Sequence, residues 1–193
     1  MKNILFLFPI ILLLIAGCVS VRPTDFTYFY DRKDTGLSSR INIDGYYVSE
    51  RECDSAFFSV FMFYPDGLFT IATTSNADLV AECFSTGGKS KICQYPSWGT
   101  YRLIGDTIKT QTVIVEGMAS SCIFRDYLIL PDGSIINFSD YVNPDKSKLM
   151  YMRNYPSFRT NQCAAPARFY PITEKRKKTD CPYLSKEWFS SDK

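Results

Sequence analysis

The chain has 193 residues, and its 22 lysines and arginines nearly balance 20 aspartates and glutamates, which leaves a formal net charge of +2. Such a balance supplies no basic footprint for nucleic acid, so we expect no nucleic-acid partner. The chain contains no histidine, which removes the usual general base of serine and cysteine nucleophiles and the commonest zinc ligand. We therefore expect neither a metal site nor a cofactor.

The first seventeen residues predict an export signal, which leaves a mature chain of one modest domain with tails. Lys2 supplies the positive start and Ile4 to Ile15 the apolar segment. That segment is shorter than the ~20 residues that a helix needs to cross a bilayer, which argues against a transmembrane anchor. The segment ends in Ile15-Ala16-Gly17-Cys18, which resembles the lipobox of bacterial lipoprotein precursors. The resemblance implies that Cys18 is acylated after cleavage and anchors the chain to a membrane.

Six further cysteines form an even set in a chain expected to enter an oxidising compartment, and this pattern favours disulfides. They are Cys53, Cys83, Cys93, Cys122, Cys163 and Cys181. Six cysteines allow 15 pairings, and the sequence does not choose among them. Cys83 with Cys93 and Cys163 with Cys181 are the first pairs to consider, because each pair is close in sequence. No CxxC spacing is present to favour zinc instead.

Residues 18–40 predict a polar, turn-rich tether that carries an aromatic cluster, Phe26, Tyr28, Phe29 and Tyr30. The tether is either a flexible spacer or a segment that docks on the domain through these aromatic side chains. An exposed aromatic patch would be a liability, which favours docking.

Residues 41–155 predict an all-β domain, an eight-stranded antiparallel up-and-down barrel with a short helix in a long loop. Pro65-Asp66-Gly67 and Pro131-Asp132-Gly133 each have the residues that a tight hairpin turn requires. The expected strands are Asp44–Val48, Ala56–Tyr64, Leu68–Thr74, Trp98–Ile104, Thr107–Val115, Ile123–Leu130, Ser134–Tyr141 and Leu149–Arg153.

The second expected strand is apolar on both faces. Phe57, Phe61 and Phe63 share one face, whereas Val60 and Met62 lie on the other. A strand with one wet face should alternate between apolar and polar residues, so another element is expected to cover its outer side. The tether, the tail and a partner protein are the three candidates.

Two regions interrupt the regular succession of strands. In Ser75–Ser97, Asn76 is placed to cap a short helix through Ala77–Cys83, and the connection is either a lid over the barrel mouth or a plug. Residues 156–193 form a proline-rich tail that we expect to be irregular. Its charge run, Glu174–Lys178, is more typical of a solvated loop than of contact with lipid headgroups.

Motifs for catalysis are missing from the sequence, and we do not expect an enzyme. Asp66, Asp106 and Asp132 stand in turns, where local hydrogen bonds to the backbone explain them. Neither GxGxxG nor GxxxxGK[ST] occurs. A pair of catalytic carboxylates that meet only in space stays open as an alternative, although the sequence singles out no such pair.

Several strand and turn motifs resemble the lipocalin-like lipoproteins of Bacteroidota across about Ile41 to Arg153. They are Gly45-Tyr46-Tyr47, the first Pro-Asp-Gly hairpin, Trp98-Gly99-Thr100-Tyr101 and Gly105-Asp106-Thr107-Ile108. The resemblance implies an eight-stranded barrel that holds a small hydrophobic molecule. No acidic run follows Val19 to direct surface display, so we expect a chain lipid-anchored in the outer membrane and facing the periplasm.

Two functions follow from this reading. The first is a carrier whose interior binds a small apolar ligand. The second is a non-enzymatic interaction or structural module of the envelope, with a filled barrel and a protein partner, because an eight-stranded interior is only just wide enough for side chains or one small ligand. The candidate ligand-binding residues are Phe57, Phe61, Phe63, Phe69, Trp98, Tyr101, Phe124, Tyr127 and Phe138.

Overall fold

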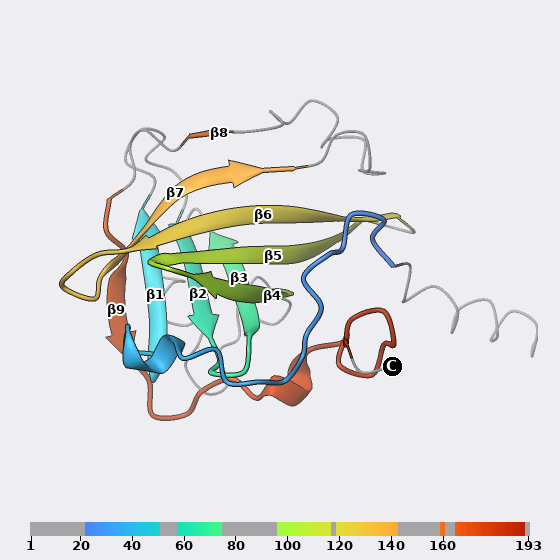
Figure 1. Ribbon diagram of the computed structural model, residues 1–193, viewed down its shortest axis with the longest axis horizontal. Coiled ribbons are helices and arrows are strands. Elements are labelled where there is room, and N and C mark those ends of the chain that lie inside the picture. The colour runs from blue at the N-terminus through green and yellow to red at the C-terminus, as the bar shows by residue number, and fades with distance from the viewer. Residues whose placement is uncertain are drawn as a thin grey trace, which may run out of the picture.

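The computed structural model describes residues 22–50, 58–74, 96–116, 119–142, 159–160 and 165–191. Nine strands of these residues form one antiparallel sheet in the order β8-β7-β6-β5-β4-β3-β2-β1-β9. The sheet curls strongly, so that β1 and β9 stand across from β6 and β7 (Figure 1). The expected all-β, up-and-down barrel architecture is confirmed. The strands are β1 (Gly45–Glu50), β2 (Phe58–Phe63), β3 (Leu68–Thr74), β4 (Ser97–Ile104), β5 (Thr107–Glu116), β6 (Ala119–Ile129), β7 (Ile135–Tyr141), β8 (Arg159–Thr160) and β9 (Arg168–Pro171).

The tail adds β9 to the curled sheet, beside β1. Tyr47 of β1 pairs with Phe169 of β9, and the backbone N–H of Ala167 donates to the carbonyl of Ile135 in β7 at 2.7 Å. The short segment 167–171 therefore contacts β1 through a ladder and the start of β7 through one isolated bridge. The expected eighth strand, Leu149–Arg153, and the short helix within Ser75–Ser97 lie outside the described residues.

The tail is not irregular throughout, contrary to the sequence-based expectation. It contributes β9 and a 3₁₀ helix, η4 (Lys178–Asp180). Pro171 forms the last residue of β9, so the tail prolines confine this strand to four residues without preventing it. Gly45 permits the pairing, because a Cβ there would lie 2.1 Å from the Tyr170 carbonyl oxygen.

Both Pro-Asp-Gly turns form as their residues predict. Gly67 has φ of 91° and Gly133 has φ of 81°, which is the left-handed conformation that glycine adopts without a steric penalty. The Tyr64 N–H donates to the Leu68 carbonyl at 3.0 Å across the first turn. The sequence therefore sets the register of the β2–β3 hairpin locally.

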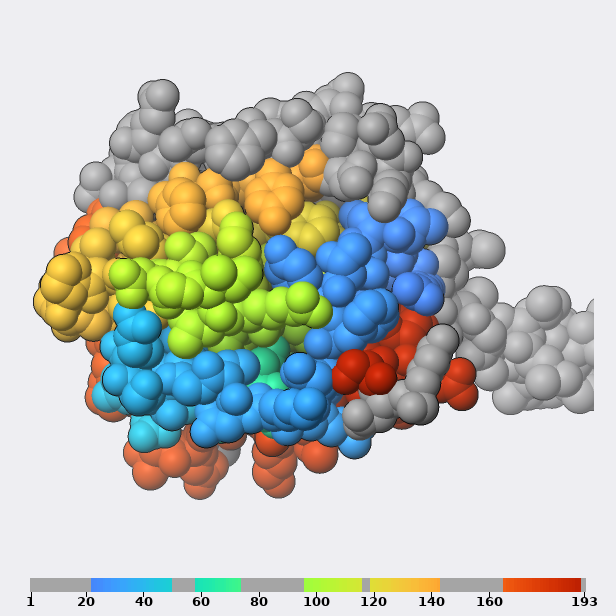
Figure 2. Space-filling model, viewed as in Figure 1, coloured from blue at the N-terminus to red at the C-terminus, as the bar shows by residue number. Residues whose placement is uncertain are grey.

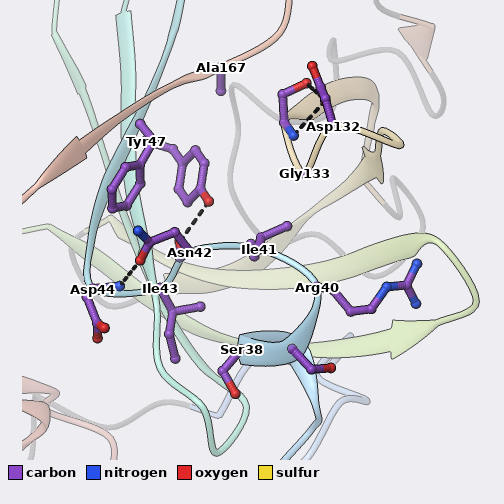
Figure 3. Close-up of a pocket in the computed structure, with 13 residues that line it drawn as sticks. Ser38, Arg40, Ile41, Asn42, Ile43, Asp44, Tyr47, Asp132, Gly133 and Ala167 are labelled. Carbon is purple, nitrogen blue, oxygen red and sulfur yellow. Dashed lines mark hydrogen bonds between the residues drawn. The ribbon is translucent and has the colours of Figure 1, made fainter.

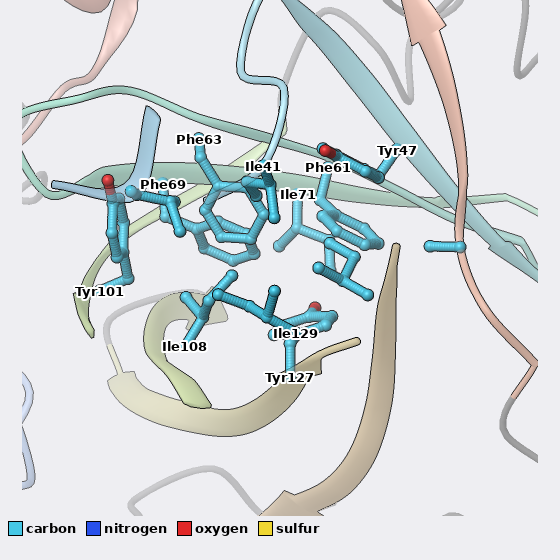
Figure 4. Close-up of a cluster of buried hydrophobic side chains, with 13 residues drawn as sticks. Ile41, Tyr47, Phe61, Phe63, Phe69, Ile71, Tyr101, Ile108, Tyr127 and Ile129 are labelled. Atoms are coloured by element: carbon cyan, nitrogen blue, oxygen red, sulfur yellow. The ribbon is translucent and has the colours of Figure 1, made fainter. Parts of the chain in front are cut away.

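The barrel interior holds one cluster of buried apolar side chains, which we call the interior cluster (Figure 4). Phe61 and Phe63 of β2 face Phe69 of β3 and Tyr127 of β6 within it. The 3₁₀ helix η1 (Leu37–Ser39) adds Leu37, which is fully buried. The cluster comprises Leu37, Ile41, Tyr47, Phe61, Phe63, Phe69, Ile71, Tyr101, Ile108, Tyr127, Ile129, Ile135 and Ala167.

A second cluster lies on the outer face of the sheet, where both chain ends cover β4 to β6, and we call it the outer cluster. Phe26 of the tether packs on Trp188 and Phe189 of the tail at ring-centroid distances of 5.1 and 5.4 Å. Figure 2 shows these two segments in contact on the surface. The tether is therefore docked, as the second of its two interpretations proposed. The cluster comprises Phe26, Tyr30, Tyr64, Leu68, Trp98, Val113, Cys122, Phe124, Cys181 and Phe189.

Both faces of β2 are buried, as its doubly apolar sequence predicts. Phe61 and Phe63 enter the interior cluster. On the other face, Val60 and Met62 are fully buried in a separate group with Tyr46, Val48, Phe58 and Ile172. The tail residue Ile172 supplies part of the cover that the sequence requires.

Candidate functional site

Five of the expected ligand-binding residues meet inside the barrel, but they contact one another. Phe61 lies 4.9 Å from Tyr127 between ring centroids, and Phe63 lies 5.1 Å from Phe69 and 5.3 Å from Tyr101. All five are at most 3% exposed. Their rings fill this part of the interior with mutual contacts, which is the geometry of a packed core.

The other expected ligand-binding residues are elsewhere. Trp98 and Phe124 belong to the outer cluster, where Phe124 stacks on Tyr141 at 4.8 Å. Phe138 is half-buried on β7, at an irregularity where Asp126 pairs with Ser139 and Tyr127 with Asn137. Phe57 lies outside the described residues. The structure therefore does not gather the expected set around one cavity.

A pocket of about 620 Å³ opens instead at the end of the barrel where η1 and the β6–β7 turn lie (Figure 3). We call it the mouth pocket. Its floor is apolar and largely buried, and its rim is mostly polar and exposed, with Ile43, Gly133 and Ser134 half-buried. The floor consists of Ile41, Tyr47 and Ala167 with the half-buried Phe169, and the rim consists of Ser38, Ser39, Arg40, Asn42, Ile43, Asp44, Asp132, Gly133 and Ser134.

Tyr47 fixes the loop that forms one wall of the mouth pocket. Its hydroxyl donates to the Asn42 carbonyl at 2.7 Å, and the Asn42 side-chain oxygen accepts the Asp44 N–H at 2.9 Å. Burial raises the pKa of Tyr47 to about 12, so the hydroxyl keeps its proton and its donor role at physiological pH. Figure 3 shows both bonds around Asn42.

The opposite wall is the second Pro-Asp-Gly turn. Asp132 accepts hydrogen bonds from the backbone N–H and hydroxyl of Ser134 at 2.9 and 2.6 Å. These bonds hold the pKa of Asp132 below its usual range, so the carboxylate stays charged at neutral pH. The expectation that local hydrogen bonds to the backbone explain Asp132 in its turn is confirmed.

Charge at the rim is asymmetric. Arg40 forms an ion pair with Asp106 of the β4–β5 turn, and Figure 3 shows its guanidinium directed away from Tyr47 and Asp132. The carboxylates of Asp44 and Asp132 are both exposed at the rim. The pocket therefore offers apolar surface below, hydrogen-bonding groups above and two carboxylates at its edge.

Lys175 supports the same loop from below. Its ammonium donates to the carbonyls of Ile43 and Phe63, both at 2.6 Å, and lies 4.7 Å from the centroid of the Tyr64 ring. Burial lowers the pKa of Lys175 to about 8. The charge run Glu174–Lys178 is therefore not simply a solvated loop, because one of its lysines is bound to the barrel.

Two of the turn carboxylates make longer-range bonds than the sequence indicated. Asp66 accepts from the Tyr30 hydroxyl at 2.7 Å and from the Lys178 ammonium at 2.6 Å, and Asp106 binds Arg40. Their partners are far away in the sequence, so local turn chemistry could not reveal these contacts. Asp66 joins the tether, the tail and the first hairpin at one point.

The two described cysteines are free thiols, contrary to the expected disulfides. Cys122 and Cys181 are both buried, and Cys122 accepts a hydrogen bond from the Gln111 amide at 3.1 Å. Burial raises the pKa of both thiols, that of Cys181 to about 12, which keeps them protonated and inert. The pairing of Cys163 with Cys181 is therefore not found, and Cys18, Cys53, Cys83, Cys93 and Cys163 lie outside the described residues.

The rim of the mouth pocket was not anticipated from the sequence, since it consists of loop residues without a motif. Its one local signal was the second Pro-Asp-Gly turn, which positions residues 132–134. Among the described residues, no group of three or more cysteine, aspartate or glutamate side chains is placed to hold a metal ion. In the same residues, no helix has the length and apolar character for a membrane span.

The chain matches no protein-family model, no curated protein and no solved structure.

Proposed function

We propose that this chain is a lipid-anchored lipoprotein of the cell envelope that binds a small amphipathic molecule, without catalysis, in the mouth pocket. The observation that carries the proposal is the contrast between an aromatic interior in mutual contact and a pocket of about 620 Å³ above it. That volume lies within the range of small-molecule sites, which combine an apolar lining with a few polar groups. The anchor is the acyl chain expected at Cys18.

The chemistry of the pocket selects the ligand class. The apolar part of the ligand would lie on Tyr47 and Phe169, whose rings are 5.2 Å apart. Its polar part would reach Asn42 and Ser38 at the rim. Asp44 and Asp132 disfavour a negative head group, because like charges brought together repel. A neutral or cationic amphiphile therefore fits better than a fatty-acid anion.

Three ligands with the same octyl chain separate these classes: octyl glucoside, octylamine and octanoate. Each is titrated, below micelle formation, into the chain carrying Cys18→Ser and purified from its own host, with binding followed by calorimetry. Octyl glucoside and octylamine should bind, and octanoate should bind about tenfold more weakly, which corresponds to about 1.4 kcal/mol. Equal binding of all three would reject the proposed selectivity of the rim.

A matched pair of variants on β9 locates the site. Phe169→Ala removes part of the pocket floor, whereas Tyr170→Ala removes the neighbouring side chain, which stacks on Tyr46 outside the pocket. Loss of a buried aromatic contact costs on the order of 1–2 kcal/mol, so Phe169→Ala should weaken octyl glucoside binding by about tenfold. Tyr170→Ala should leave it unchanged. Equal effects of the two substitutions would place the binding elsewhere.

A second candidate function is a protein-interaction module, and one observation favours it. Ile104 and Leu128 are 56% and 39% exposed, and both pair with Thr107 across the sheet. They form a small apolar surface of the kind that protein partners cover. Failure of every amphiphile to bind, together with retention of an envelope protein that Ile104→Asp releases, would replace the first proposal with this one.

A further inference from the structure

The tether is bound to the barrel from its first described residues onward. The Asp25 carboxylate accepts hydrogen bonds from the Ser121 hydroxyl and the Cys122 N–H, both at 3.0 Å. Phe26 next to it is 2% exposed in the outer cluster. The chain is therefore attached to the β5–β6 end of the sheet at residue 25.

The attachment continues along the tether. The Gln111 side-chain oxygen accepts the N–H groups of Thr27 and Tyr28 at 3.0 and 2.7 Å. The Tyr30 N–H then donates to the Phe189 carbonyl at 2.8 Å. Backbone and side-chain hydrogen bonds hold residues 25–30 against the barrel, so this part of the tether does not act as a flexible spacer.

Only a short length of chain joins this docked part to the expected anchor. Arg22 stands four residues after Cys18. Four residues span at most about 14 Å when fully extended, at about 3.5 Å each. An acylated Cys18 would therefore hold Arg22 within about 14 Å of the lipid headgroups.

The mouth pocket lies at the other end of the barrel. Asp25 binds next to the first residues of β6, whereas Asp132 follows the last ones. From Cys122, which binds Asp25, to Ile129, the last residue of β6, the strand advances by seven residues, which is roughly 23 Å at about 3.3 Å per residue. Figure 1 shows the described start of the chain at one end and η1 with the β6–β7 turn at the other.

The surface near the anchored end suits contact with a bilayer. Phe29 is 36% exposed, and the Arg22 guanidinium lies 5.8 Å from the centroid of its ring. Val115, which pairs with Ser120 next to the Asp25 site, is 56% exposed. Aromatic and basic side chains together are favoured at the headgroup level.

We propose that the face formed by residues 22–30 and the β5–β6 end of the sheet rests on the lipid headgroups, so that the mouth pocket is presented away from the membrane. This inference rests on the proposed lipid anchor at Cys18. It assigns the occupant of this face to the bilayer that carries the anchor, because only three residues, Val19–Val21, lie between Cys18 and Arg22 and keep this face within about 14 Å of the lipid headgroups.

Quenching of tryptophan by brominated lipid tests the orientation. Trp188 packs on Phe26 at 5.1 Å and reports on the anchored face, and Trp98→Phe makes it the sole tryptophan. For the opposite end, the variant Trp98→Phe/Trp188→Phe/Ser38→Trp places the reporter at the pocket rim. The lipidated chains are reconstituted into vesicles of phosphatidylethanolamine and phosphatidylglycerol that contain lipid brominated near the headgroup.

If this face rests on the headgroups, brominated lipid should reduce Trp188 emission about twofold, because the short connection from Cys18 to Arg22 keeps Trp188 close to the membrane interface. Emission from the pocket rim should not change. Equal quenching of both reporters, or quenching of the rim alone, would overturn the orientation. Cofractionation of the lipidated chain with vesicles, and its loss in Cys18→Ser, tests the anchor separately: if the chain binds vesicles and Trp188 is not quenched, only the orientation fails.

A variant with a longer connection between Cys18 and Arg22 is the matched control. Twenty glycine and serine residues inserted between Val21 and Arg22 add an average reach of about 25 Å. Quenching of Trp188 should then fall, since the short connection no longer holds the face at the headgroups. Unchanged quenching would show that the length of the connection does not set the distance.

Discussion

The interior cluster and the outer cluster are both aromatic, but they are assembled in different ways. Phe61, Phe63 and Phe69 of the interior cluster come from one hairpin, within nine residues of one another. The outer cluster joins Phe26 to Phe189, close to opposite ends of the chain. Local strand pairing therefore brings together the three phenylalanines of the interior cluster, whereas the outer cluster places the two ends of the chain on a surface that the sheet provides.

This difference assigns the two clusters different energetic roles. The interior cluster stabilises the sheet on which every other contact depends, so its loss should lower the free energy of unfolding of the whole domain. The outer cluster attaches two segments to a finished surface, so its loss can be limited by local detachment. Three substitutions test that contrast.

Phe61→Ala should have the largest effect. The side chain is fully buried and contacts Tyr47, Phe63, Phe69 and Tyr127. Removing such an aromatic ring leaves a cavity and lowers the free energy of unfolding by about 3–5 kcal/mol. Urea unfolding measures the change, and Leu128→Ala, at an exposed position, should change it little. A cost for Phe61→Ala no larger than that control would mean that the interior is not a packed core.

The same contrast explains how much of the molecule could be predicted from its sequence. Alternation and turn residues are local signals, and they identified the β2–β3 hairpin and the burial of both faces of β2. The filled interior was one of two alternatives that the sequence left open. β9 was missed because Pro166 and Pro171 flank a segment that pairs with β1, more than a hundred residues earlier. Strand pairing at that separation leaves no local pattern.

The mouth pocket was missed for a related reason. The pocket combines η1, the loop to β1, the β6–β7 turn and β9, and none of these segments carries a recognisable motif of a binding site by itself. The expected ligand-binding residues were chosen because they are aromatic and apolar, and the structure uses the same property to pack them together. Aromatic residues on inward positions predict a core and a cavity equally well, and the contacts among their rings decide between the two.

Phe189→Ala should have an intermediate effect and a local signature. Phe189 is fully buried between Phe26, Tyr30 and Trp188. Truncation should weaken the attachment of the chain ends by about 2–3 kcal/mol, below the interior value because the segments can detach without unfolding the barrel. Hydrogen exchange measures this directly at the Tyr30 amide, which donates to the Phe189 carbonyl.

The control for this variant is an amide of the barrel itself. The Tyr101 N–H donates to the Gly67 carbonyl at 2.8 Å. Its amide should exchange as slowly in the Phe189→Ala variant as in the unchanged chain. Faster exchange at both amides to the same degree would show that the chain ends and the barrel unfold as one unit, and the distinction between the clusters would fail.

Asp66→Asn should have the smallest effect and should depend on pH. Asp66 connects the first hairpin to both chain ends through Tyr30 and Lys178. Burial pushes the pKa of Asp66 up, but the bonds from Lys178 and Tyr30 outweigh it and hold the pKa below its usual value. Because the folded chain binds this proton less tightly than the unfolded chain, the stabilisation is present above the unfolded pKa and is lost as pH falls through the folded one.

Asp66→Asn should therefore lower the free energy of unfolding by about 1 kcal/mol at pH 7, since charge-assisted hydrogen bonds are lost but Lys178 is largely exposed. The difference between the two chains should begin to shrink below about pH 4, where the unfolded carboxyl becomes protonated, and should disappear only at a lower pH, where the folded carboxyl is protonated as well. Asp132→Asn is the matched control, because Asp132 has the same place in the second Pro-Asp-Gly turn but binds only its neighbour Ser134. If the two substitutions gave equal pH profiles, the bonds from Asp66 to the chain ends would contribute nothing beyond the turn itself, and the attachment of tether and tail would depend on the aromatic contacts alone.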